Sequence, residues 1–152
     1  MKNIISIIIA IMMIACIYFL VTDTFGNNPC YVGDTQKMDN VSVVVTRVED
    51  GTFYGTEKSS NGKWVRVYFT MENFNDEPYR VSYSDFTIND TYTIRETNYR
   101  LTNIESGGFN LVKGNKYEFW CVFDCSYGYA EKDLIFIWDN GGIFGETREW
   151  VI

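Results

Sequence analysis

The 152-residue sequence contains no histidine, only two prolines and four cysteines, and no internal repeat. Without histidine the chain cannot form Ser-His-Asp or Cys-His nucleophilic systems, and most catalytic zinc sites are excluded. Acidic residues gather in several loops, including Asp85 and Asp90, but no loop fits a calcium-binding pattern such as D-x-D-x-D-G. We therefore expect no enzymatic activity, no cofactor and no metal site, and we interpret the acidic loops as solvated charge.

Positive charge is also scarce, with 13 basic residues against 20 acidic ones and a net charge of −7. Lys2 is the only charged residue before Asp23, so the chain from Asp23 onward carries a net charge of −8. Such a field repels a phosphate backbone, so we expect no nucleic-acid binding. Direct adhesion to anionic lipid headgroups is disfavoured for the same reason.

The longest uncharged run of the chain lies at its N-terminus, from Ile4 to Val21. These residues would span about 27 Å as a helix, close to the thickness of the hydrocarbon layer. The run is longer than the apolar part of a cleavable signal peptide, and no A-x-A site follows it. It predicts a single-pass anchor through residues 4–21 in the cell membrane, with the C-terminal domain outside.

Two alternatives to this anchor remain open. Met13-Ile14-Ala15-Cys16 loosely resembles a lipoprotein box, in which Cys16 would be lipidated and become the new N-terminus. Ordinary signal cleavage is the other. The sequence thus divides into a membrane anchor or signal segment (1–22), a polar tether (23–40) and one folded domain (41–152).

Segments with alternating apolar and polar residues follow the tether, separated by turn dipeptides such as Asp50-Gly51 and Asn61-Gly62. In Lys63–Asn73, one face is wholly apolar and should face the core: Val65, Val67, Phe69 and Met71. About seven to nine antiparallel strands and the lack of a helical period predict an all-β sandwich or barrel. The expected strands are Val41–Glu49, Thr52–Thr56, Lys63–Asn73, Tyr79–Asn89, Thr91–Arg95, Tyr99–Ile104, Lys116–Cys125, Asp133–Asp139 and Ile143–Val151.

Several of these motifs together resemble one bacterial family of immunoglobulin-like extracellular domains of unknown function. The motifs are Val32-Gly33-Asp34-Thr35, the VSVVVTRVED strand, VRVYFTMENFNDEP, SYSDFTIND and Leu111-Val112-Lys113-Gly114. The family occurs on lipoproteins and anchored surface proteins, and it is similar in fold to a secreted immunogenic antigen of mycobacteria. The resemblance implies an immunoglobulin-like β-sandwich outside the cell and carries no catalytic residues with it.

Three cysteines lie outside the apolar run: Cys30, Cys121 and Cys125. On one extended strand the Cα atoms of Cys121 and Cys125 would be about 13 Å apart, too far for a disulfide. We therefore favour a bridge from Cys30 to one of them, with three reduced thiols as the alternative.

Aromatic residues on the strand faces opposite the expected core, together with two in a loop, form a candidate ligand platform: Trp64, Tyr68, Trp120, Tyr127 and Tyr129. Such a platform suits a sugar ring or a peptide, although cross-strand aromatic pairs also stabilise a sheet without any ligand.

Our leading hypothesis is thus a surface-displayed, non-enzymatic interaction module that binds a protein or a glycan. One alternative is a structural or accessory domain of a membrane complex that acts through its helix. The other is an envelope hydrolase that uses two carboxylates.

Overall fold

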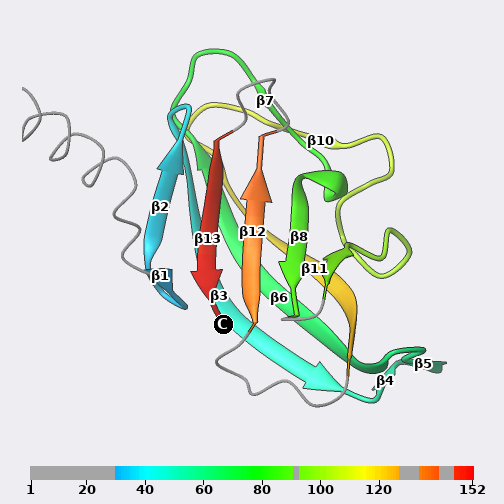
Figure 1. The fold of residues 1–152 in the computed structure, drawn as a ribbon. Helices are drawn as coiled ribbons and strands as arrows, with labels where there is room; N and C mark the ends of the chain where they lie inside the picture. The colour runs from blue at the N-terminus through cyan, green and yellow to red at the C-terminus, as the bar shows by residue number, and fades with distance from the viewer. Residues whose placement is uncertain (1–29, 91–92, 127–133, 141–145) are drawn as a thin grey trace, which may run out of the picture.

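The computed structural model describes residues 30–90, 93–126, 134–140 and 146–152, and it folds them into an all-β sandwich. The elements are β1 (Cys30–Tyr31), β2 (Thr35–Met38), β3 (Val41–Gly51), β4 (Phe53–Tyr54), β5 (Glu57–Lys58), β6 (Gly62–Asn73), β7 (Tyr79–Val81), the 3-10 helix η1 (Tyr83–Asp85), β8 (Phe86–Asn89), β9 (Ile94–Glu96), β10 (Phe109–Leu111), β11 (Lys116–Ser126), β12 (Ile135–Asp139) and β13 (Thr147–Val151). One layer has the strand order β11-β6-β3-β2 and the other has the order β1-β13-β12-β8-β9. Figure 1 views the second layer in front of the first, with the small β4-β5 sheet extending from the far end of β3.

The core lies between the two layers, where the alternating apolar residues of β6 and β11 point. Val65, Val67, Phe69 and Met71 are fully buried, which confirms the predicted inner face of β6. The ring of Phe69 joins the layers, because its centroid lies 4.5 Å from that of Phe86 and 5.4 Å from that of Phe136. On β11 the alternating side chains of Phe119, Cys121, Phe123 and Cys125 are buried in the same core, but Tyr117 at the start of the strand stays 39% exposed.

A β-bulge in β3 decides which of its side chains reach the outer surface. Before the bulge Val41, Val43 and Val45 point into the core, and the register with β6 then shifts between Val45 and Arg47. The extra residue reverses the alternation, so Arg47 and Glu49 lie on the outer face beside Tyr68 instead of inside the core.

Residues 30–38, predicted to belong to the polar tether, form β1 and β2 instead. β1 pairs in parallel with β13, and β2 pairs with β3 in the other layer, so this segment closes one side of the sandwich. Gly33, at φ +98°, makes the turn between them. Side chains join β2 to β13, since Gln36 Nε2 donates to the carbonyl oxygen of Glu149 (2.5 Å). Strands this short carry too few residues for alternation to be visible in the sequence.

Three other expected strands also differ. Tyr79–Asn89 is interrupted by η1, whose capping box joins the Ser82 and Asp85 side chains to each other's backbone. Thr52–Thr56 does not return along β3, which pairs with β6, and belongs to the separate β4-β5 hairpin. Tyr99–Ile104 forms turns and bends along the edge of β11. Each difference arises where side-chain hydrogen bonds or a non-local strand replace the local pairing that periodicity assumes.

The predicted anchor, Ile4–Val21, lies outside the described residues, and so does Cys16. Within the described part of the chain, no helix has the length and apolar character needed to cross a membrane.

Candidate binding groove

The β4-β5 hairpin lies over the outer face of the β11-β6-β3-β2 sheet and covers part of the predicted aromatic platform. Trp64 Nε1 donates a hydrogen bond to the carbonyl oxygen of Glu57 (3.1 Å), which ties β6 to the hairpin. Trp64 and Tyr68 are only 6% and 7% exposed, so the expectation that they form an open surface is wrong. Alternation along β6 could not reveal this cover, because it assigns Trp64 to the outer face but does not predict that the preceding hairpin contacts that face.

Arginine side chains cover the neighbouring tyrosines. The guanidinium of Arg47 lies 4.0 Å from the centroid of the Tyr68 ring, and that of Arg66 lies 4.0 Å from the centroid of Tyr54. The hydroxyl of Tyr68 donates to Glu49 (2.9 Å), whose carboxylate also pairs with Arg47 (3.2 Å). These cation–π contacts and hydrogen bonds commit Tyr68 to the fold rather than to a ligand.

Trp120 of β11 is also occupied by intramolecular contacts. Its backbone N–H donates to Asn103 Oδ1 (2.8 Å), and its Nε1 donates to the carbonyl oxygen of Leu101 (3.2 Å). Asn103 Nδ2 returns a hydrogen bond to the carbonyl oxygen of Glu118 (3.1 Å), so one amide side chain pairs with the strand edge as a backbone would. Tyr127 and Tyr129, the other predicted platform residues, lie outside the described residues.

Between the hairpin and the chain after β9, the outer face of this sheet is hollowed into an open groove of about 500 Å³. Its floor contains Trp64 and Asp124, which are cross-strand partners on β6 and β11. Glu57, Lys58 and Ser60 line it on one side, and Glu96, Asn98, Tyr99 and Arg100 line it on the other. The volume falls in the range of small-molecule and cofactor sites.

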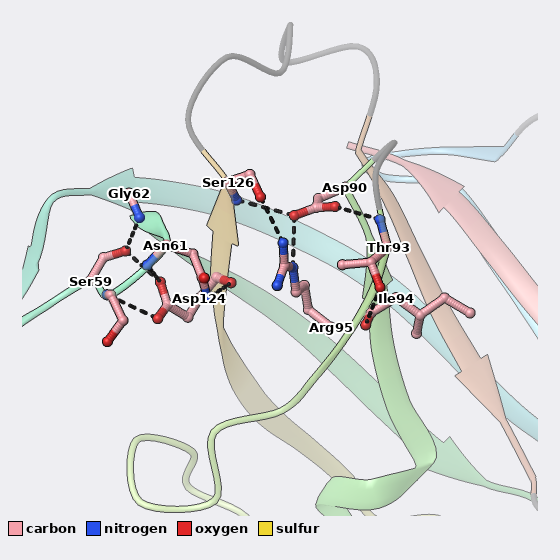
Figure 2. A network of polar contacts seen from close by, with 10 residues as sticks. Ser59, Asn61, Gly62, Asp90, Thr93, Ile94, Arg95, Asp124 and Ser126 are labelled. Carbon is pink, nitrogen blue, oxygen red and sulfur yellow. Dashed lines mark hydrogen bonds and ion pairs between the residues drawn. The ribbon is translucent and has the colours of Figure 1, made fainter.

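Asp124 holds the hairpin side of the groove in place, as the left part of Figure 2 shows. Its carboxylate accepts hydrogen bonds from the hydroxyl of Ser59 and from the backbone N–H groups of Ser60 (3.0 Å) and Asn61 (3.1 Å). Ser59 Oγ in turn accepts from the N–H of Gly62 (2.7 Å). A carboxylate that accepts several donors from one turn fixes the turn's conformation.

Asp90 performs the same role for the opposite side and is fully buried, contrary to the expectation of solvated loop charge. It accepts from Arg95 Nε (2.8 Å) and from the backbone N–H groups of Thr93 (3.0 Å) and Ser126 (3.1 Å). Arg95 Nη2 also donates to Ser126 Oγ (2.6 Å), so the network joins β9 to the end of β11 (Figure 2). Because Glu96 follows Arg95 directly, this pair between a buried carboxylate and a partly buried guanidinium positions the start of the second wall.

The polar groups that face the groove have few partners within the protein. Among the described residues, the Glu57 and Glu96 carboxylates, the Lys58 ammonium and the amide nitrogen of Asn98 form no hydrogen bond or ion pair. Tyr99 is 56% exposed, and its hydroxyl accepts a hydrogen bond from Arg100 Nε (3.0 Å). The sequence pattern did not indicate these residues, because they have no characteristic spacing and come from two separate segments, residues 57–58 and 96–100.

The three described cysteines are free, so the expected bridge from Cys30 is not formed. Cys30 lies in β1 of one layer, whereas Cys121 and Cys125 lie on the core face of β11 in the other. Burial raises the pKa of each of these two thiols to about 12. They therefore pack as neutral core side chains rather than as nucleophiles or metal ligands. In the part of the chain that the structure describes, no group of acidic or sulfur side chains is arranged to hold a metal ion.

Comparison with known proteins identifies a family for most of the chain. The model of a domain of unknown function, DUF4352, matches residues 30–148, and no curated protein matches the sequence. The match begins at β1, which agrees with the inclusion of β1 and β2 in the sandwich.

Solved bacterial structures share the fold at low sequence identity. The chain resembles the YjhA protein of Bacillus subtilis (TM-score 0.56, 18% identity, 72% of this chain and 81% of that one). It is also similar to YcdA, a candidate lipoprotein of Bacillus subtilis, with a TM-score of 0.57 and 14% identity. The match covers 76% of this chain and 37% of YcdA. The secreted protein MPT63 of Mycobacterium tuberculosis is similar as well, with a TM-score of 0.59 and 13% identity. The match covers 83% of this chain and 99% of MPT63. These likenesses agree with the immunoglobulin-like family that the sequence motifs resemble.

Proposed function

The chain belongs to the DUF4352 family of domains of unknown function, and we propose that it is a non-enzymatic binding domain that takes a protein or glycan ligand at the cell envelope. The groove carries this proposal, because two carboxylate networks support its lining segments. Among the described residues, the Glu57 and Glu96 carboxylates, the Lys58 ammonium and the amide nitrogen of Asn98 form no hydrogen bond or ion pair. Polar side chains that converge on one hollow without intramolecular partners are suited to a ligand.

The apolar run Ile4–Val21 supports an envelope location. Two structural neighbours support it as well, since one is a candidate lipoprotein and the other is a secreted protein. We propose that the chain is a single-pass membrane protein with its β-sandwich outside. Mass spectrometry of the mature N-terminus tests this: an intact N-terminus is expected, and a diacylglyceryl group on Cys16 would replace the helix by a lipid anchor.

Retention of envelope material tests the binding proposal. The full chain in detergent micelles is immobilised and exposed to cell-wall and membrane fractions, next to Glu96→Ala and a matched control, Glu105→Ala. Glu105 is an exposed acidic residue that does not line the groove. The expected result is a component retained by the wild type and Glu105→Ala but lost with Glu96→Ala. Equal retention by all three, or by none, contradicts binding in the groove.

Two further outcomes separate the competing functions. If replacing residues 4–21 by an unrelated apolar helix abolishes function while Glu96→Ala does not, the domain is an accessory part of a membrane complex. If a retained ligand is cleaved and Glu96→Gln stops the cleavage, the domain is a hydrolase that uses carboxylates.

A further inference from the structure

The chemistry of the groove lining narrows the ligand class, and this step rests on the proposed function. Each side chain that lines the groove is aromatic, carries a charge, or bears an amide or a hydroxyl group, and none is aliphatic. A peptide partner is usually anchored by apolar side chains that enter apolar pockets. This groove offers no such pocket, so a peptide would bury its apolar side chains against charged groups at a desolvation cost.

A saccharide matches the same lining. Its adjacent hydroxyl groups both donate and accept hydrogen bonds, so they can satisfy a carboxylate and an amide side by side. Glu96 and Asn98 provide that pair on one wall, separated by one residue, and Ser60 and Lys58 provide a hydroxyl and a cation opposite. The Asp90 and Asp124 networks hold these walls before a ligand arrives, which reduces the ordering cost of binding.

Tyr99 adds the aromatic surface that sugar rings commonly contact. It lines the groove, and more than half of its surface is exposed, unlike the covered Trp64 and Tyr68. The Arg100 guanidinium lies 5.5 Å from the centroid of the Tyr99 ring, a longer contact than the 4.0 Å between Arg47 and Tyr68, and the Tyr83 ring lies 6.2 Å away. The apolar C–H face of a pyranose ring packs against such a ring, while its hydroxyl groups remain free to reach the walls. Of the aromatic residues in the described part of the chain, Tyr99 thus takes the role that the sequence assigned to other positions.

The local charge selects among saccharides. The lining contains three acidic residues, Glu57, Glu96 and Asp124, against two basic ones, Lys58 and Arg100, in a protein with a net charge of −7. A sulfated or phosphate-rich polymer would be repelled by this field. We infer that the groove is a binding site for a neutral oligosaccharide, held by Tyr99 stacking and by hydrogen bonds to Glu96 and Asn98.

Isothermal titration of the full chain in detergent micelles tests the inference. The neutral probes are maltotriose, cellotriose and chitotriose. A heparin-derived trisaccharide serves as the polyanion, and a set of soluble mixed-sequence decapeptides represents protein ligands. We expect measurable binding of at least one neutral trisaccharide and a loss of about tenfold in affinity with Tyr99→Ala or Asn98→Ala.

Matched variants outside the groove provide the control. Tyr31 is 55% exposed, nearly the same as Tyr99, and lies in β1, so Tyr31→Ala should bind like the wild type. Asn110→Ala in β10 is the control for Asn98→Ala. Circular dichroism and the thermal midpoint of each variant confirm that the fold is retained.

The possible failures are distinguishable. Binding of peptides or of the sulfated trisaccharide alone, lost with Tyr99→Ala, overturns the neutral saccharide but leaves a binding domain. Saccharide binding that is equal in Tyr99→Ala and Tyr31→Ala overturns the groove as its site. Absence of binding to all probes overturns the inference, and the envelope-retention experiment then decides the proposed function independently.

Discussion

At the scale of single residues, two carboxylates determine the shape of the groove. Asp124 lies in the floor of the groove and accepts hydrogen bonds from a single turn, residues 59–61. Asp90 lies outside the lining and accepts hydrogen bonds from two segments, residues 93–95 and Ser126. A fully buried carboxylate such as Asp90 is stable only while these donors compensate for its lost hydration. Its contribution to folding should therefore far exceed that of an exposed acid.

Asp90→Ala should lower the free energy of unfolding by about 2–3 kcal/mol, since Arg95 and two backbone N–H groups lose their acceptor. Urea unfolding measures the change. The control is Asp76→Ala, which breaks the exposed pair with Lys113 and should cost less than about 0.5 kcal/mol. Equal effects of the two substitutions would contradict the role of Asp90.

At the scale of elements, short segments with little pairing of their own cover the parts of the sheet that long strands leave open. The chain from Thr97 to Gly108 runs along the edge of β11 and bonds to it through Asn98, Thr102 and Asn103. The β4-β5 hairpin covers the outer face over Trp64. An uncovered strand edge is a template for pairing with another chain, so this cover also limits self-association.

Asn103→Ala should remove the partners of the Trp120 N–H and the Glu118 carbonyl together and destabilise the domain by about 1–3 kcal/mol. Faster hydrogen exchange at the Trp120 amide would locate the effect, and size-exclusion chromatography would detect dimers formed through the freed edge. Asn110→Ala, at an exposed position in β10, should leave both readouts at wild-type values.

Trp64→Phe keeps an aromatic ring in place but removes the hydrogen bond to Glu57, which ties the hairpin to β6. The expected loss of stability is about 1–3 kcal/mol, because one neutral hydrogen bond is broken and part of a buried ring is removed. Amides of residues 53–58 should exchange faster, while those in the centre of β6 keep their protection. Uniform acceleration throughout β6 would show that the hairpin is not a separate covering element.

At the scale of the whole molecule, the sandwich excludes water from groups that would otherwise ionise at high pH. Burial is the largest cause that raises the pKa of Cys121, Cys125 and Tyr79, each to about 12. The ordinary values of these groups are 9.0 for the thiols and 10.0 for the phenol, so the unfolded chain loses its protons first. The folded state then binds more protons than the unfolded state, and stability falls as the pH rises.

These groups should therefore leave the free energy of unfolding unchanged below about pH 9. Between about pH 9 and pH 12 they should make it fall, because only the unfolded chain ionises there. Replacing Cys121 by Ala removes one titrating group, so the decline should become shallower, although the small cavity lowers stability at every pH. Urea unfolding at a series of pH values measures the slope. An unchanged slope in Cys121→Ala would show that this thiol does not contribute to the alkaline loss.

The sequence by itself determined the all-β class and the inner faces of the long central strands. Val65 to Met71 alternate without exception, and burial of one face of such a strand is imposed by the hydrophobic effect. The motifs in VSVVVTRVED and SYSDFTIND were sufficient to indicate the family. Periodicity failed for β1, β2 and η1, where elements are short and turns are set by side-chain hydrogen bonds.

Only the tertiary structure decided which surface is open. Trp64 and Tyr68 alternate away from the core as predicted, yet the hairpin and the arginines cover them, while Tyr99 in an irregular segment stays exposed. Alternation assigns a side chain to one face of a sheet, but whether that face is covered depends on how the adjoining hairpin folds and on side chains of the neighbouring strand such as Arg47. The groove exists because β5 and the chain after β9 flank the same stretch of β6 and β11, a juxtaposition that no local pattern encodes.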